Sequence, residues 1–189
     1  DWLGLLTHPD GRIALFHDSA LEHVMHANIK EYNIELATWL PDSGYFVLRR
    51  PSGWYLAVCA HAPSPRHQPG HAHCDIGSFE LSLRGRRLVV DTGTGSYQNS
   101  EIRRLCRSTG AHNVPMLEGN EQSDMWGDFR VGKRAQLMTA EHLEHSFELQ
   151  WRDMSENIFI RRIDWGESSL RIRDIRHVGQ ADGRFVSLL

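Results

Sequence analysis

Cysteine is scarce in this chain of 189 residues, which also has no excess of basic charge and no long apolar run, and each of these features argues against a class of protein. The three cysteines (Cys59, Cys74 and Cys106) are an odd count without metal-ligand spacing, which argues against a disulfide framework. Lysine and arginine total 21 against 24 acidic residues, and the resulting net charge of −3 argues against nucleic acid as a partner. Because the apolar runs are short, we expect no membrane-spanning helix and no membrane partner.

The two ends of the sequence lead us to expect a piece of a longer protein. Residues 1–4 include no initiator methionine and lack the basic start and apolar stretch of a secretory signal. Residues 184–189 have the composition expected for the start of a further strand. We therefore expect a domain that is truncated at its C-terminal end.

The pattern of apolar residues changes near residue 41. Residues 19–39 place apolar side chains at roughly helical spacing, and Ser19 and Glu22 have the spacing of a capping box. Beyond this segment, short β-rich stretches alternate with turn residues, and two hairpins are predicted: 45–49 with 54–60, and 77–83 with 87–91. Further strands are expected at 113–117, 134–140, 145–151, 158–165 and 170–175, and a short helix at 100–106. The pattern predicts a mostly β fold, an antiparallel β-sandwich of supersandwich type with a short helical N-terminal lead-in.

The chain has 12 histidines, and their spacing singles out one region. His71 and His73 are two residues apart, so on a strand both imidazoles would face the same side. A hairpin that turns at 84–85 pairs residues whose numbers sum to about 169, which places Asp91 near the His73 end of the first strand. His112 supplies a third imidazole. Two imidazole nitrogens and one carboxylate oxygen, from His73, His112 and Asp91, make an open site for Zn²⁺ with water as the fourth ligand.

Less specific interpretations stay open on these residues alone. A chain so rich in histidine produces one H-x-H pair by chance, and Asp91 can simply form a turn with the residues that follow it. A cupin-like metal site is a further alternative, with Glu80 as the third ligand. Glu80 follows His73 by seven residues, which is long for the cupin pattern.

Several ordered blocks extend the pattern from about residue 70 to residue 135. In one-letter code they are 70–82 (GHAHCDIGSFELS), 90–94 (VDTGT) with Tyr97, 107–113 (RSTGAHN), 122–123 (QS) and 129–131 (FRV). Together they resemble the C-terminal β-sandwich domain of the heparinase II/III-like polysaccharide lyases. Blocks with consistent gaps are more specific than one H-x-H pair, so the resemblance favours the metal site over chance.

The resemblance implies a domain organisation and an activity. In this family a helical α/α toroid precedes antiparallel β-sheets, the substrate cleft lies between them, and uronic-acid polysaccharides are cleaved by β-elimination. Residues 1–40 would then form the seam with a toroid that this chain lacks, and residues 41–189 the β-sandwich domain. The resemblance also implies a mainly structural zinc at His73, Asp91 and His112, and catalytic residues at His71 and Tyr97.

The residue types suit this chemistry. Elimination removes the C5 proton beside a carboxylate, so the reaction needs a base, an acid and stabilisation of the enolate. His71 can act as base or charge neutraliser, and Tyr97 as a proton carrier if its pKa is lowered. Arg103 and Arg107 can bind uronate carboxylates through two parallel hydrogen bonds, unless they belong with Arg104 to a solvated helix face. The catalytic residues that the family carries on its toroid have no match here.

Other functions stay open beside an acidic-polysaccharide lyase. A non-catalytic carbohydrate-binding module would stack sugars on exposed tryptophans, for which the candidates are Trp54, Trp126, Trp151 and Trp165. A cupin-like enzyme would use Glu80 as a ligand in place of Asp91. Polysaccharide-degrading lyases of bacteria are commonly periplasmic or secreted, whereas free thiols suit a reducing compartment, so the location also stays open.

Overall fold

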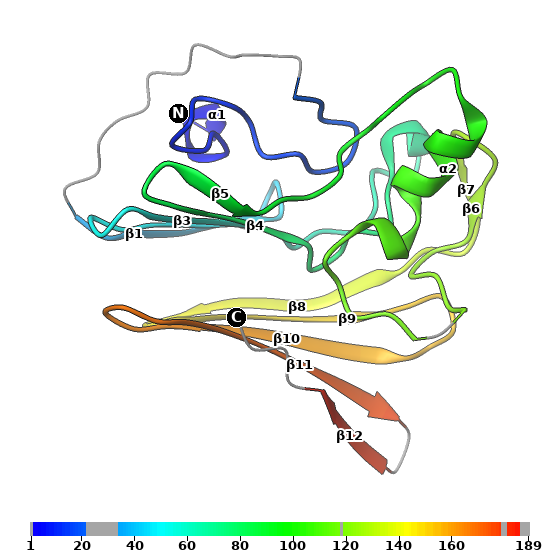
Figure 1. The fold of residues 1–189 in the computed structure, drawn as a ribbon. Coiled ribbons are helices and arrows are strands. Elements are labelled where there is room, and N and C mark those ends of the chain that lie inside the picture. The colour runs from blue at the N-terminus through cyan, green and yellow to red at the C-terminus, as the bar shows by residue number, and fades with distance from the viewer. Residues whose placement is uncertain (1, 22–33, 118, 179–180, 186–189) are drawn as a thin grey trace.

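Two five-stranded antiparallel sheets lie face to face in a computed structural model that describes residues 2–21, 34–117, 119–178 and 181–185 (Figure 1). In each sheet the strands follow one another in chain order. The first sheet consists of β1 (Leu36–Leu40), β2 (Tyr45–Arg49), β3 (Trp54–Cys59), β4 (Phe79–Leu83) and β5 (Arg86–Val89). The second consists of β8 (Gln136–Leu143), β9 (Ser146–Arg152), β10 (Ile158–Trp165), β11 (Leu170–Val178) and β12 (Ala181–Phe185).

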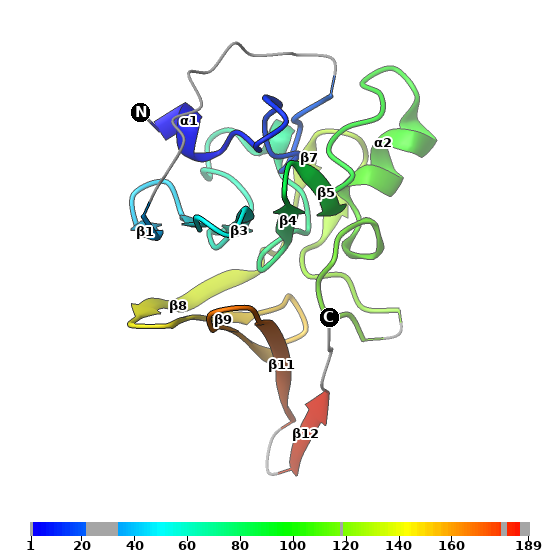
Figure 2. The same ribbon diagram turned by 60° about the vertical axis from the view of Figure 1, so that its left-hand side comes forward.

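Shorter elements gather mainly at one end of the first sheet (Figures 1 and 2). They are η1 (Pro69–His71), α2 (Ser100–Arg107), η2 (Thr109–Ala111) and the small pair β6 (Met125–Trp126) and β7 (Arg130–Val131), while α1 (Trp2–Leu5) lies near the N-terminus. Within the described ranges, no helix combines the length and the apolar character needed to cross a membrane.

The main core lies between the two sheets. β10 alternates between buried and partly exposed residues along its whole length, as expected for a sheet with one solvated face. Phe46 of β2 stacks on Phe147 of β9 with the ring centres 4.4 Å apart, and Trp151 is fully buried among the same residues. Aromatic side chains of both sheets thus fill the space between the layers.

The first sheet is covered on both faces, which explains why all residues of β2 and β3 after the first are buried. Phe46 faces the second sheet, whereas Val47 and Tyr55 face the N-terminal segment. Leu6 and Phe16 of that segment are buried against this outer face (blue in Figure 1). The packing holds the segment in place and carries the residues that follow Phe16 to the edge of the sheet.

The predicted fold class is confirmed, because the chain is mostly strands in two packed antiparallel sheets. Both predicted hairpins form, as β2 with β3 and β4 with β5. The predicted helix corresponds to α2, and the last four predicted strands correspond to β8, β9, β10 and β11.

Two predictions are wrong. No strand forms at 113–117, because the Asn113 side chain bonds the backbone N–H and C=O of Phe79, at 2.9 and 2.8 Å, in place of a strand ladder. The helical spacing predicted for 19–39 fails at its end, since Leu36–Leu40 pairs with β2 as β1 and Trp39 packs on Phe147, with ring centres 5.2 Å apart. Residues 22–33 of that predicted helix lie outside the described residues.

Replacing Gly77 by alanine tests how closely the two sheets pack. Gly77 has a φ of +89°, and an added Cβ would lie 3.1 Å from the Trp151 ring of the opposite sheet. Gly85, in the turn between β4 and β5, has a φ of +76° and open space around an added Cβ. We expect Gly85→Ala to lower the free energy of unfolding by about 1–2 kcal/mol through backbone strain alone. Gly77→Ala should lower it by about 1–3 kcal/mol more through overpacking.

Urea denaturation of the two variants measures this difference. Equal losses of stability in Gly77→Ala and Gly85→Ala would contradict the close contact between Gly77 and Trp151.

Candidate functional site

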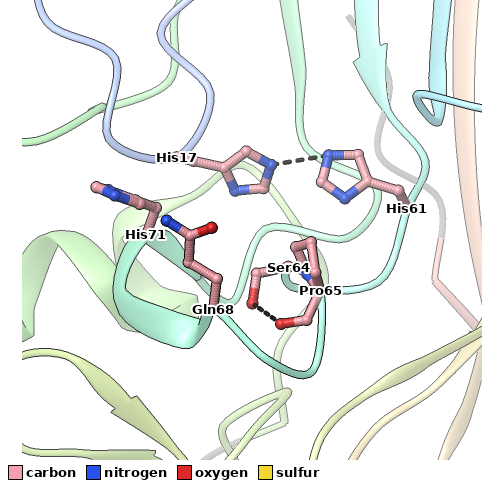
Figure 3. A pocket seen from close by; sticks show the side chains of 6 residues that line it. All are labelled: His17, His61, Ser64, Pro65, Gln68 and His71. Atoms are coloured by element: carbon pink, nitrogen blue, oxygen red, sulfur yellow. Dashed lines mark hydrogen bonds between the residues drawn. The ribbon is translucent and has the colours of Figure 1, made fainter.

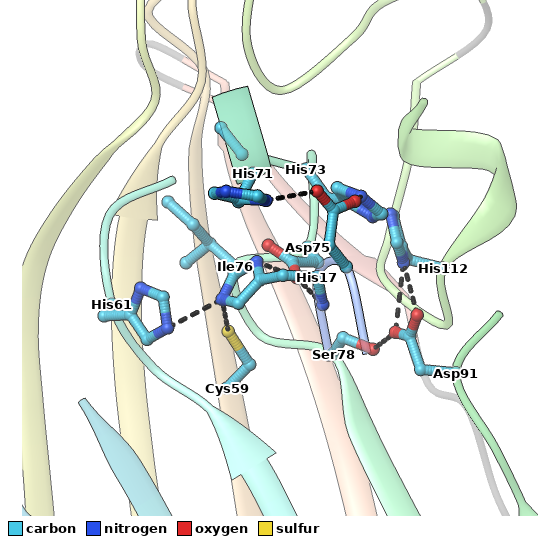
Figure 4. A network of polar contacts seen from close by, with 12 residues as sticks. His17, Cys59, His61, His71, His73, Asp75, Ile76, Ser78, Asp91 and His112 are labelled. Carbon is cyan, nitrogen blue, oxygen red and sulfur yellow. Dashed lines mark hydrogen bonds and ion pairs between the residues drawn. The ribbon is translucent and has the colours of Figure 1, made fainter. Parts of the chain in front are cut away.

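Four of the predicted site residues meet at the end of the first sheet where β3 and β5 finish and β4 begins: His71, His73, Asp91 and His112 (Figure 4). They come from the loop at 71–78, the segment after β5, and the region of α2 and η2. The N-terminal segment adds His17 and Asp18 to the same place. Four segments that are distant in sequence therefore build one network of polar contacts.

The carboxylate of Asp18 joins these segments. Its Oδ2 lies 2.6 Å from Nδ1 of His71, and its Oδ1 lies 2.9 Å from Nε2 of His73. The guanidinium of Arg103 donates to both oxygens, with 2.9 Å between Nη2 and Oδ2. Burial raises the pKa of Asp18, but the hydrogen bonds from His73, Arg103 and His71 lower it more, so its pKa lies well below the ordinary value. The carboxylate is therefore ionised at neutral pH.

His71 is the exposed imidazole of the network, with 61% of its side chain accessible. Because its Nδ1 donates to Asp18, its Nε2 carries the lone pair. The ring lies on the wall of a pocket of about 260 Å³ (Figure 3). The other residues that line this pocket are His17, His61, Ser64, Pro65 and Gln68. His71 can thus accept a proton from a molecule in the pocket.

The prediction that His71 and His73 share the face of a strand is wrong in its geometry. His71 ends η1, which Pro69 begins, and His73 lies in the loop that follows. The two imidazoles nevertheless meet, because both bind the same carboxylate of Asp18.

Asp91 lies against His112, as the hairpin register predicted it would lie near this end of the sheet. Leu83 pairs with Arg86 as expected, and a bulge next to Leu81 shifts the pairing by one residue. The carboxylate oxygens of Asp91 are 2.8 and 3.0 Å from Nδ1 of His112. Burial lowers the pKa of His112, but the hydrogen bond with Asp91 raises it more, so its pKa lies above the ordinary value. This contact fixes the orientation of the His112 ring.

The imidazoles of His73 and His112 lie beside each other, with ring centres 5.4 Å apart. Each ring uses one nitrogen for a carboxylate, Nε2 of His73 for Asp18 and Nδ1 of His112 for Asp91. The other two nitrogens are buried and have no hydrogen-bond partner within the described part of the chain. Such unpartnered buried nitrogens are rare in native proteins, and these are the atoms with which the two rings can ligate a metal. The structure thus brings His73, Asp91 and His112 together, while their role as ligands stays a prediction.

His17 and Asp75 complete the network. Oδ2 of Asp75 lies 2.7 Å from Nδ1 of His17, while its Oδ1 is buried without a hydrogen-bond partner among the described residues. Burial raises the pKa of Asp75, but the charge and hydrogen bond of His17 lower it more, to well below the ordinary value. The His17 ring lies 6.2 Å from the His73 ring.

The sequence reasoning did not find Asp18, His17 or Asp75. Asp75 stands two residues after His73 in the same motif, so its spacing was a usable signal. Asp18 is separated from His73 by 55 residues, and no local pattern connects them.

Arg103 and Arg107, which were predicted to bind substrate, are fully buried in α2. Besides Asp18, Arg103 donates to the carbonyl oxygen of Gly70 at 2.7 Å. Arg107 donates to the carbonyl oxygen of Ala72 at 2.8 Å. These bonds hold the loop that carries both histidines, so burial favours a structural role over direct contact with substrate. A role toward substrate stays a prediction.

Tyr97 is half-exposed, and the Arg103 guanidinium lies over its ring, 5.0 Å from the ring centre. Burial, together with the nearby Asp18 carboxylate, raises the pKa of Tyr97. This direction is opposite to the lowered pKa considered from the sequence. A phenol that stays protonated is suited to donate a proton and not to remove one.

The two alternative functions find no support in these contacts. Glu80, which a cupin-like site would need as a ligand, binds Nε2 of His8 at 2.6 Å and the backbone N–H of Leu15 at 2.6 Å. Of the four tryptophans considered as sugar platforms, Trp151 and Trp165 are buried in the core. The four therefore form no exposed row.

Fold and site together define an antiparallel β-sandwich domain with a pocket rich in histidine and a carboxylate-centred network at one end. Residues 35–185 match the family described as Heparinase II/III-like, C-terminal. The chain therefore belongs to this family, which confirms the resemblance seen in the sequence.

Solved structures share the fold. A heparinase III, the BT4657 gene product, superposes with a TM-score of 0.66 at 16% identity over 92% of this chain. A heparan sulfate lyase HepC mutant from Pedobacter heparinus superposes with a TM-score of 0.64 at 18% identity over 93% of this chain. The chain spans 31% of the length of each of these proteins. No curated protein matches the sequence.

Replacing Asp18 by asparagine removes the counter-charge of the buried Arg103. We expect Asp18→Asn to lower the free energy of unfolding by about 3–5 kcal/mol, because a buried guanidinium is left without its partner. Asp10 forms an ion pair with Arg87 that is partly exposed, so Asp10→Asn is the matched control. The control should lower the free energy by less than about 1 kcal/mol. Urea unfolding at neutral pH measures both, and equally small losses would contradict the central position of Asp18.

The stability that Asp18 contributes also has a definite pH dependence. A carboxylate whose pKa is lower in the folded than in the unfolded state stabilises the fold above its ordinary pKa, here 3.8, and loses that effect as the pH falls. The difference in unfolding free energy between the wild type and Asp18→Asn should therefore shrink between about pH 4 and pH 2. Denaturation midpoints over this range test the sign, and a difference that grows on acidification would show the sign to be wrong.

Proposed function

We propose that this chain is the β-domain of a lyase that cleaves a uronic-acid-containing polysaccharide, of the glycosaminoglycan type, by β-elimination. Membership of the heparinase II/III-like family and the names of the structural relatives, heparinase III and heparan sulfate lyase, support the substrate class. The observation that carries the proposal is the exposed His71, whose Nδ1 is held by a buried carboxylate and which lines a pocket.

The reaction makes specific demands on the groups around the sugar. The proton at C5 of the uronate is removed beside the carboxylate, and the bond between C4 and its oxygen then breaks. The base must reach the proton, and an acid must reach the leaving oxygen. Negative charge develops on the uronate carboxylate, and fixed positive or hydrogen-bond-donating groups stabilise it.

His71 and Tyr97 fit the two proton-transfer roles in this proposal. His71 accepts the C5 proton at Nε2, or as an imidazolium neutralises the uronate, and Asp18 keeps the ring in the required tautomer. Tyr97, a phenol that is protonated at neutral pH and whose pKa is raised further, donates to the leaving oxygen. Arg103 acts indirectly, because its guanidinium holds Asp18 and is buried beside the rings of Tyr97 and Phe129.

In this proposal His73, Asp91 and His112 would hold a structural zinc ion that braces the wall of the pocket, once their ligand atoms move closer together. Two imidazoles on one tetrahedral zinc have ring centres about 5 Å apart, and those of His73 and His112 are 5.4 Å apart. Each ring also has a buried nitrogen without a hydrogen-bond partner among the described residues. Direct ligation by Asp91 requires that its hydrogen bond to His112 be exchanged for the metal contact.

A helical domain of the same protein is the partner that the proposal requires. The structural relatives are about three times as long as this chain, which leaves room for such a domain in a longer protein. Ile102 and Leu105 of α2 are exposed, although Arg103 and Arg107 of the same helix are buried. A neighbouring domain that covers this apolar side of α2 would supply further substrate contacts.

Activity should be measured on the longer protein in which this chain is the β-domain. Cleavage by elimination leaves an unsaturated uronate that absorbs in the ultraviolet, and we expect this product from a heparan-type polysaccharide. His71→Ala should lower kcat by about 10²- to 10⁴-fold, because a proton-transfer group is removed. His145→Ala, at an exposed histidine after β8, is the control and should retain the wild-type rate. Saturated products, or full activity in His71→Ala, would contradict the proposal.

Metal analysis distinguishes the roles of His71 and His73. His73→Ala and His112→Ala should each lose the zinc bound at this site, because each removes a ligand. His71→Ala should keep that zinc, because His71 lies on the pocket side of Asp18. Loss of the same zinc in His71→Ala would overturn the proposed division between catalytic and metal-binding residues.

A further inference from the structure

A second cluster of metal-type ligands lies beside the residues at 73, 91 and 112. It consists of His17, Cys59 and His61, whose ligand atoms all lie within 4.8 Å of one another. Nε2 of His17 is 2.8 Å from Nε2 of His61 and 3.9 Å from Sγ of Cys59 (Figure 4). The two histidines also line the pocket that contains His71 (Figure 3). None of these three residues has a role in the function proposed above.

Contacts on the far side of each ring decide which nitrogen faces the cluster. Nδ1 of His17 lies 2.7 Å from Oδ2 of Asp75, an ion-pair contact without hydrogen-bond geometry. Nδ1 of His61 donates to the carbonyl oxygen of Ala62 across 2.7 Å. When both rings are neutral with their N–H at Nδ1, both Nε2 atoms direct lone pairs toward each other, and the Tyr45 hydroxyl lies 3.2 Å from Nε2 of His61. Two lone pairs at this distance repel unless a positive centre, either a proton or a metal ion, lies at the cluster.

The donor set favours a metal ion. Cys59 ends β3, and its sulfur is fully buried at the cluster. Imidazole nitrogen and thiolate sulfur are the ligands that Zn²⁺ prefers. The contact of Asp75 with His17 is the arrangement by which carboxylates orient histidine ligands of zinc. The cluster therefore has both the ligands and the supporting contact of a zinc site.

The distances require only small adjustments. Zn–N bonds of about 2.0–2.1 Å and Zn–S bonds of about 2.3 Å place tetrahedral ligand atoms about 3.3 Å (N to N) and 3.6 Å (N to S) apart. The observed separations are 2.8 Å between the nitrogens and 3.9 Å between His17 Nε2 and Cys59 Sγ. Small side-chain rotations can open the first separation and close the second.

We propose that His17, Cys59 and His61 bind a Zn²⁺ ion at a site separate from that of His73, Asp91 and His112. Two of the three ligands are histidines of the pocket wall, and the Tyr45 hydroxyl lies 3.2 Å from Nε2 of His61. On binding, the Cys59 S–H bond breaks, the sulfur keeps the electron pair as a thiolate, and the proton passes to solvent.

Cobalt substitution tests the proposal on the purified chain, because only this site contains sulfur. Co²⁺ added to the metal-free protein should produce a sulfur-to-cobalt charge-transfer band in the near ultraviolet. Cys59→Ser should abolish the band, and His61→Ala should weaken cobalt binding at this site at least about 100-fold. Cys106→Ser, at another buried cysteine, is the matched control and should keep the band. His112→Ala should also keep it, which separates this site from the other one.

Zinc titration followed by thermal unfolding gives a second readout. The wild type should bind one equivalent at this site in addition to any bound at the other, and Cys59→Ser and His61→Ala should each lose that equivalent while remaining folded. No charge-transfer band in the folded wild type would overturn the proposal and leave a proton between the two histidines. A band that survives in Cys59→Ser would equally overturn it.

Discussion

The buried carboxylate of Asp18 is the contact on which the arrangement of the site depends. Arg103 provides the positive charge that keeps it ionised, and the two imidazoles of the H-x-H motif bind its two oxygens. His71 binds through Nδ1 and His73 through Nε2, so the two rings are held in opposite tautomers. One carboxylate thus leaves Nε2 of His71 free on an exposed ring and leaves His73 a free nitrogen in the buried interior near His112.

Hydrophobic packing places this carboxylate. Leu6 and Phe16 are buried on the outer face of the first sheet, and Asp18 follows two residues later. The buried pair of His8 and Glu80 ties the same segment to β4. The N-terminal segment is therefore a structural part of the site, and changes that loosen its packing should reach the pocket through Asp18.

The parts of the fold that depend on local sequence could be predicted. Alternation of apolar residues and turn signals gave the hairpins, and hairpin register placed Asp91 near the histidines because pairing from a tight turn is a local property. The site's centre could not be predicted in this way. Asp18 reaches His71 and His73 only through the packing of a third layer on the sheet, and no spacing in the sequence encodes that packing.

Helix α2 shows a second limit of what can be predicted from the sequence. Arginines are normally read as the solvated side of a helix, yet Arg103 and Arg107 point inward while Leu105 is exposed. The buried carboxylate and the loop carbonyl oxygens compensate the two charges, and those partners are visible only in the folded structure.

Nitrogen-15 NMR of the histidine rings tests the central position of Asp18 most directly, because the two imidazole nitrogens have distinct shifts in each tautomer. At a pH where the rings are neutral, the account predicts that His71 carries its proton on Nδ1 and His73 on Nε2, and that Asp18→Asn disturbs both assignments. Finding the proton of His71 on Nε2, or both rings unchanged in Asp18→Asn, would contradict the account.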